Sequence, residues 1–158
     1  MALLKEAETL GKVPLFAKLE PSKLKLLAFT SQLMTYEDGE VLFQEGDAAD
    51  AAFVIMHGEV EILADTHSGK VVVGTLGKDQ LFGELALFNN AARSATLRAK
   101  GHLEALRIAD DMFLKLVTEN PGAALEVMRQ LSDKLTRSHK QVETLQSGLH
   151  QGDASEPR

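Results

Sequence analysis

The feature that most constrains the fold is a series of glycines at short intervals through residues 33–109 of this 158-residue chain. Val60 and Ile62 alternate there with glutamates, as on a strand with one face in water. The DTHSGK segment has the composition of a hairpin turn. Many short strands separated by turn residues predict an antiparallel β-roll, of the sandwich or barrel type. The strand-like runs are EVLF, AFVIM, EVEILA, KVVVGTL, SATLRA and LEALRIA.

Helical patterns lie on both sides of this β-rich region. Apolar residues recur at helical spacing in residues 1–32 and again in residues 110–146. The last helix is expected to end before Gly148, and the polar residues 147–158 are expected to be disordered. The sequence therefore predicts one domain, residues 1–146, which is mainly β with flanking helices.

Composition and motifs exclude several classes of function. A net charge of −6 argues against a general nucleic-acid binder, which would carry a basic face. The chain has no cysteine, which excludes disulfides, thiol catalysis and cysteine metal sites. Its five histidines lack metal-binding spacing, and no nucleophile elbow or phosphate loop occurs. No apolar run has the length of a membrane span, and the N-terminus is no signal peptide. We therefore expect a cytoplasmic protein that is not an enzyme and holds no metal or cofactor.

The segment FGELALFNNAARSAT, residues 82–96, predicts a ligand site. Its glycine and the short helical run after it expose backbone N–H groups, which favour an anion. Arg93 adds a planar fork that matches two phosphate oxygens. Because the carboxylate of Glu84 would repel a phosphate, it is expected to accept a hydrogen bond from another group, such as a ribose hydroxyl. One phosphate and one ribose hydroxyl describe a compact nucleotide.

The two halves of this segment, residues 82–87 and 93–96, resemble the phosphate-binding cassette of the cyclic nucleotide-binding domain family. That family includes catabolite activator proteins, protein kinase A regulatory subunits and cyclic nucleotide-gated channels. Weaker resemblance extends to DGEVLFQEGD and to FVIMHGEVEI, where Gly58 falls at the family's hairpin. In all it covers roughly residues 12–140. The resemblance implies a β-roll and a regulatory module that has no chemistry of its own.

The resemblance also implies a role for each residue of the cassette. Glu84 and the backbone of Gly83 would hold the ribose 2′-hydroxyl group. Arg93 would pair with the cyclic phosphate, helped by the backbone N–H groups of Leu85 and Ala86.

The resemblance is less definite about the base. Ser94 would contact the phosphate, the base or both, and serine at this position occurs in the family's cAMP-binding activators. The serine at position 94 therefore favours cAMP over cGMP as the ligand. Four side chains of the last helix are candidates for covering the base: Arg129, Lys134, Leu135 and Arg137.

We therefore expect a cyclic nucleotide sensor that signals to an unidentified partner protein by moving its C-terminal helices. From Met128 to Leu149 apolar residues, interrupted by Ser138, fall at spacings of three and four. This seam indicates either a homodimer through the last helix or a helix that packs its apolar stripe on the β-roll. The activators' helix-turn-helix has no counterpart after that helix, which argues against direct DNA binding. Two alternatives stay open: a dimerisation scaffold that uses no nucleotide, and a truncated transcription regulator. The start at Met1 favours a complete small protein over an excised domain.

Overall fold

The computed structural model of the chain describes the backbone of residues 2–152 and the side chains of residues 4–136. The chain divides into two compact units, Met1–Ala123 and Ala124–Arg158. The sheet and all helices before the last belong to the first unit. In chain order the elements are α1 (Ala2–Gly11), the 3-10 helix η1 (Pro14–Phe16), α2 (Pro21–Thr30), β1 (Gln32–Tyr36), β2 (Val41–Phe43), β3 (Ala51–Thr66), β4 (Gly69–Leu76), β5 (Leu81–Phe82), α3 (Leu85–Asn89), β6 (Thr96–Ala109), α4 (Asp110–Glu119) and α5 (Pro121–Gly152).

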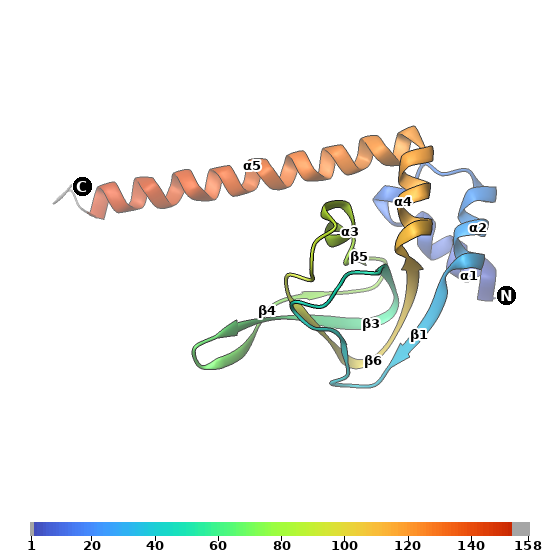
Figure 1. The fold of residues 1–158 in the computed structure, drawn as a ribbon, viewed down its shortest axis with the longest axis horizontal. Coiled ribbons are helices and arrows are strands. Elements are labelled where there is room, and N and C mark those ends of the chain that lie inside the picture. The colour runs from blue at the N-terminus through green and yellow to red at the C-terminus, as the bar shows by residue number, and fades with distance from the viewer. Residues whose placement is uncertain (1, 153–158) are drawn as a thin grey trace. The chain divides into compact units, whose positions relative to one another are not determined.

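The sheet of the first unit has six strands, all paired antiparallel. Its main path runs β1-β6-β3-β4, while β2 pairs with β6 and β5 pairs with β3. Figure 1 shows α1, α2 and α4 gathered at the end of the sheet where β1 begins and β6 ends. This arrangement confirms the predicted antiparallel β-roll with flanking helices.

The long strands β3 and β6 form the centre of the sheet, and their register shifts on both sides of His57. Gly58 lies in this bulged part of β3 with a φ of +103°, which glycine adopts without a steric penalty. The hairpin expected at Gly58 is therefore wrong, because β3 continues as one strand through the bulge. A glycine with positive φ occurs in bulges as well as in turns. Only the pairing of β3 with β6 shows that Gly58 lies in a bulge.

The hairpin predicted from the DTHSGK segment is confirmed. β3 and β4 pair up to Thr66 and Gly69, which leaves His67 and Ser68 as the turn. The hydroxyl group of Thr66 donates a hydrogen bond of 2.6 Å to the carbonyl oxygen of Gly69. All the residues that specify this turn are therefore neighbours in the sequence, which is why composition alone was sufficient to predict it.

An aromatic cluster attaches the start of the predicted ligand segment to the sheet. Phe82 of β5 pairs in register with Phe53 of β3, and their rings stack with centroids 5.3 Å apart. The ring of Phe43 lies 6.0 Å from that of Phe53. Phe53 and Phe82 are each at most 5% exposed, so burial of each contributes about 1.5–3 kcal/mol. The chain leaves β5 for the ligand segment from this fixed point.

The helices α1, η1, α2 and α4 each bury a large apolar side chain. Leu10 of α1, Phe16 of η1, Leu27 of α2 and Phe113 of α4 are at most 1% exposed. The rings of Phe16 and Phe113 meet edge to face, with centroids 6.2 Å apart. The helical spacing of apolar residues in 1–32 thus reflects burial among neighbouring helices.

The last helix, α5, continues to Gly152, past the end expected before Gly148. One glycine costs a helix only about 1 kcal/mol relative to alanine, so it is a weak stop signal. The disorder predicted for the tail stays a prediction, and residues 153–158 lie outside the described residues. No helix within residues 2–152 has both the length and the apolar character needed to cross a membrane. The described acidic and histidine side chains form no group that could hold a metal ion.

Candidate functional site

The predicted ligand segment leaves the sheet through a tight turn at Gly83. This glycine follows β5 and has a φ of +81°, a conformation that side chains rarely adopt. Glu84 is the N-cap residue of α3, and its side chain makes no capping hydrogen bond. Leu85 and Ala86 form the first turn of α3, where backbone N–H groups have no acceptor within a helix. Four of the predicted site residues are therefore consecutive, at the point where a strand gives way to a short helix.

The backbone around Arg93 is fixed against the loop that precedes β3. The N–H group of Arg93 donates a hydrogen bond of 2.8 Å to the carbonyl oxygen of Asp47. The N–H group of Gly46 donates one of the same length to the carbonyl oxygen of Arg93. Next to this pair, Ala48 and Ala92 form an isolated antiparallel bridge. Two segments far apart in the sequence thus form a small ladder, which fixes the position from which the Arg93 side chain extends.

The side chain of Arg93 is buried and held by backbone carbonyl groups. The residue is only 4% exposed, and its Nη1 and Nη2 donate to the carbonyl oxygens of Gly83 and Ala51 at 2.7 and 2.6 Å. The guanidinium carbon lies 4.0 Å from the centroid of the Phe43 ring, a distance that favours a cation–π interaction. Nε is also buried and has no hydrogen-bond partner among the described residues. Part of the donor capacity of this arginine is therefore unused.

Gly83 and Arg93 are closely packed, and the backbone of Gly83 favours glycine. A Cβ atom on Gly83 would lie 2.8 Å from Nη1 of Arg93, so the guanidinium would have to shift, and the φ of +81° is rarely adopted by residues with a side chain. The contact and the φ together explain why a glycine stands directly before Glu84 in the sequence. Arg93 thus contacts the residue that directly precedes Glu84.

Among the described side chains, no carboxylate lies at ion-pair distance from Arg93. None of the ion pairs among the described side chains includes it. Burial lowers the pKa of Arg93 from its ordinary value, whereas the nearby charges of Asp50 and Asp47 act to raise it. Arginine stays protonated in proteins, so a positive charge lies inside the structure at this point. A buried charge without a counterion is costly, which makes the site receptive to an anion.

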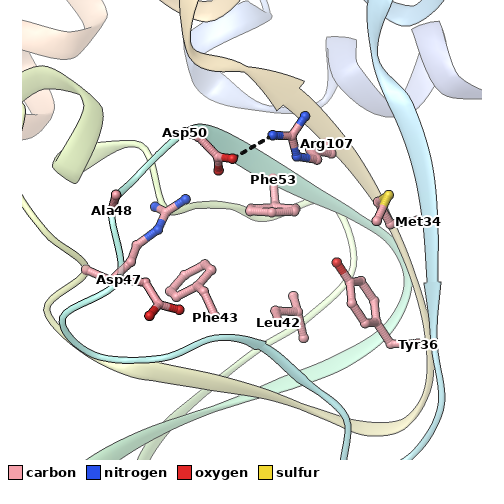
Figure 2. A pocket seen from close by; sticks show the side chains of 10 residues that line it. Met34, Tyr36, Leu42, Phe43, Asp47, Ala48, Asp50, Phe53 and Arg107 are labelled. Atoms are coloured by element: carbon pink, nitrogen blue, oxygen red, sulfur yellow. Dashed lines mark hydrogen bonds and ion pairs between the residues drawn. The ribbon is translucent and has the colours of Figure 1, made fainter.

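A cavity of about 440 Å³ lies beside Arg93 within the sheet (Figure 2). Of the six cassette residues predicted from the sequence, only Arg93 lines it. The other walls combine apolar side chains with two carboxylates and a second arginine; they are Met34, Tyr36, Leu42, Phe43, Asp47, Ala48, Asp50, Phe53 and Arg107. The cavity thus lies against the arginine but not against the turn at Gly83.

The structure describes the side chains of all but one of the remaining predicted residues. Ser94 is exposed, in the bend before β6 begins at Thr96. Arg129, Lys134 and Leu135 lie on α5, within the second unit, where Arg129 Nη1 is 3.9 Å from Glu126 Oε1. The side chain of Arg137 lies outside the described residues. The predicted contacts of these residues with a base stay predictions.

Sequence reasoning missed three charged residues beside Arg93, which are Asp47, Asp50 and Arg107. Arg107 of β6 donates from Nη2 to Oδ2 of Asp50 at 3.0 Å, and both line the cavity (Figure 2). The sequence does contain an indication for Arg107. Side chains alternate between the two faces of a strand, so Arg107 lies on the same face of β6 as the core residues Leu103 and Ala105. No comparable signal marked Asp50, which lies in a loop.

Comparison with known proteins agrees with this geometry. The family model described as cyclic nucleotide-binding domain matches residues 33–120. A cAMP-dependent protein kinase regulatory subunit of Mycosarcoma maydis is 33% identical over 130 residues, which cover 82% of this chain and 24% of that protein. The chain spans about a quarter to a third of the length of the curated relatives it matches first.

Solved structures show the same fold. The Thermus thermophilus catabolite activator protein has a TM-score of 0.75 at 27% identity, covering 84% of this chain and 63% of that one. The regulatory domain of Toxoplasma gondii PKA, crystallised with cAMP, has a TM-score of 0.68 at 26% identity and covers 72% of this chain and 43% of that one. The match to the family model extends over more than half of the sequence. This chain therefore belongs to the cyclic nucleotide-binding domain family.

Proposed function

We propose that this chain is a regulatory module that binds cAMP through Arg93 and the turn between β5 and α3. The observation that carries the proposal is the buried guanidinium of Arg93, which contacts Gly83 and has no carboxylate partner among the described residues. Of the five N–H donors of an arginine, two are used by the carbonyl oxygens of Gly83 and Ala51. The other three have no hydrogen-bond partner among the described residues, and we assign those on the cavity side to the oxygens of a phosphodiester.

The first N–H groups of α3 would add to this interaction. Leu85 and Ala86 follow the turn directly, so their backbone donors and the Arg93 guanidinium belong to the same short segment. Charge-assisted hydrogen bonds contribute about 1.5–3 kcal/mol each. A dissociation constant in the micromolar range requires about 8 kcal/mol, which several such bonds provide together.

We further propose that Glu84 accepts a hydrogen bond from the ribose 2′-hydroxyl group. Its carboxylate would repel the phosphate, and its place directly after Gly83 keeps it within the same turn. Two observations support cAMP over cGMP as the ligand. One is Ser94 in the cassette, and the other is that several relatives are regulatory subunits of cAMP-dependent protein kinases. The base would be covered by the α5 candidates Arg129, Lys134, Leu135 or Arg137.

The output of the module would be a movement of its C-terminal helices, read by a partner protein or by a second copy through α5. A ligand shifts such an equilibrium only if it binds the two states with different affinities. We expect no enzymatic activity, because the described residues of the site offer donors for an anion and no nucleophile with an adjacent base.

Isothermal titration calorimetry of the wild-type chain tests the proposed ligand. We expect saturable heat with cAMP at one site per chain and a dissociation constant in the micromolar range. cGMP should bind more weakly, and linear 5′-AMP, which carries a different phosphate, weaker still. A chain that is folded and gives no saturable heat with either cyclic nucleotide would contradict the proposal.

The role of Glu84 is tested by a cycle of two proteins and two ligands. Wild type should bind 2′-deoxy-cAMP about tenfold more weakly than cAMP, because one hydrogen bond to a charged group is lost. The Glu84→Ala variant should bind the two ligands equally, because the partner of the 2′-hydroxyl is absent. If wild type does not distinguish the two ligands, Glu84 does not hold the ribose.

A further inference from the structure

Arg107 is a second arginine in the cavity beside Arg93, and the proposed function gives it no task. It pairs in register with Phe53, and its side chain follows the buried residues Leu103 and Ala105 on the same face of β6. Its Nη2 lies 3.0 Å from Oδ2 of Asp50, as the dashed line in Figure 2 marks. The side chain of Arg107 is 27% exposed and that of Asp50 is 69% exposed, so the ion pair lies at the open side of the cavity.

Asp50 is also the carboxylate that acts most strongly on Arg93. Among the charged neighbours it makes the largest contribution to raising the pKa of Arg93. It directly precedes Ala51, whose carbonyl oxygen accepts a hydrogen bond of 2.6 Å from Arg93. Asp50 is therefore adjacent in the chain to a residue that contacts the guanidinium, and Asp50 and Arg93 line the same cavity.

Asp47, the other carboxylate close to Arg93, is engaged in its own loop. Its Oδ2 accepts a hydrogen bond of 2.9 Å from the N–H group of Gln44. Both acids near Arg93 thus have other partners, one through an arginine and one through a backbone amide. Because both carboxylates have other partners, the guanidinium of Arg93 contacts two carbonyl groups and an aromatic ring instead.

We propose that Arg107 is a positioning residue for the nucleotide site. By holding Asp50 in an ion pair, it keeps that carboxylate away from Arg93 and leaves the guanidinium to the phosphate. This inference rests on the proposed function. A carboxylate on Arg93 would compete for the same N–H donors as the phosphate, and the observed affinity falls with the fraction of binding-competent protein.

Calorimetry on four proteins tests the proposal. Arg107→Met keeps an apolar stem but frees Asp50, and it should bind cAMP about tenfold more weakly than wild type. Arg107→Met combined with Asp50→Asn should return to within about twofold of wild type, because the competing carboxylate is gone. Arg107→Lys retains a cation for Asp50 and should also stay close to wild type.

A matched control separates this competition from a general effect of charge. Arg107→Met combined with Asp47→Asn removes the same charge from the neighbourhood of Arg93, but from a residue that Arg107 does not bind. We expect no recovery of affinity in this protein. Equal recovery by the Asp47 and Asp50 substitutions would overturn the proposal, and so would wild-type affinity in Arg107→Met.

A crystal structure of ligand-free Arg107→Met gives an answer that does not depend on nucleotide binding. We expect the Asp50 carboxylate within about 4 Å of the Arg93 guanidinium, the distance of an ion pair. An Asp50 side chain that stays in solvent would overturn the proposal. If wild type binds no cyclic nucleotide, the proposed function fails, and this structure still decides whether Arg107 restrains Asp50.

Discussion

Replacing Arg93 with leucine should weaken cAMP binding by at least about a hundredfold. The substitution removes two or more charge-assisted hydrogen bonds to the phosphate, each contributing about 1.5–3 kcal/mol, and every 1.4 kcal/mol is a factor of about ten in affinity. It also leaves the carbonyl oxygens of Gly83 and Ala51 without their donors. Binding is measured by calorimetry at a temperature where circular dichroism shows that the variant is folded.

Arg98→Leu is the matched control for this prediction. It makes the same substitution five positions along the chain. Arg98 pairs instead with Glu61 on the neighbouring strand, at 2.8 Å. We expect its affinity for cAMP to stay within about twofold of wild type, because a partly exposed ion pair outside the site contributes little. If folded Arg93→Leu binds cAMP as tightly as Arg98→Leu does, the phosphate is not held by Arg93.

Gly58→Ala should be among the most destabilising single-methyl changes in the chain. The φ of +103° disfavours any side chain, and a Cβ atom there would collide with the backbone oxygen of His102 and lie 3.0 Å from the Cα of Leu103. Backbone strain and a steric clash each cost about 1–3 kcal/mol, so we expect a loss of about 3 kcal/mol. For a chain of this size that lowers Tm by about 6–12 °C in a thermal unfolding experiment.

Gly69→Ala separates the two parts of that loss. Gly69 has a similar φ of +110°, but a Cβ atom there meets nothing within 4 Å. This variant should therefore lose only the conformational part, about 1 kcal/mol. Equal losses in the two variants would show that the close approach of β6 to Gly58 has no energetic effect.

The contrast between these glycines also shows what the sequence can predict about the fold. The turn after Thr66 was predicted correctly because the residues that specify it are adjacent. The sequence predicts a hairpin at Gly58, whereas the structure has a bulge there, because the conformation of Gly58 depends on β6, which lies far away in the sequence. Local turn chemistry is readable from one segment, whereas the choice between a turn and a bulge requires the partner strand.

The same distinction holds for the candidate site. The spacing of Gly83 and Arg93 led to the expectation that they belong to one site, and the structure brings them into contact. The carbonyl group of Ala51 was not predicted as a partner of Arg93, because it comes from another strand. The sequence predicts a strand at Arg107 and no function for its side chain, although the alternation with Leu103 and Ala105 indicates the inner face of the sheet.

A crystal structure of the wild-type chain with cAMP tests the central claim most directly. We predict that the cyclic phosphate lies within hydrogen-bond distance of the Arg93 guanidinium and of the N–H groups of Leu85 and Ala86. The ribose 2′-hydroxyl group should contact Glu84. A nucleotide bound elsewhere, with its phosphate away from Arg93, would contradict this account of the site.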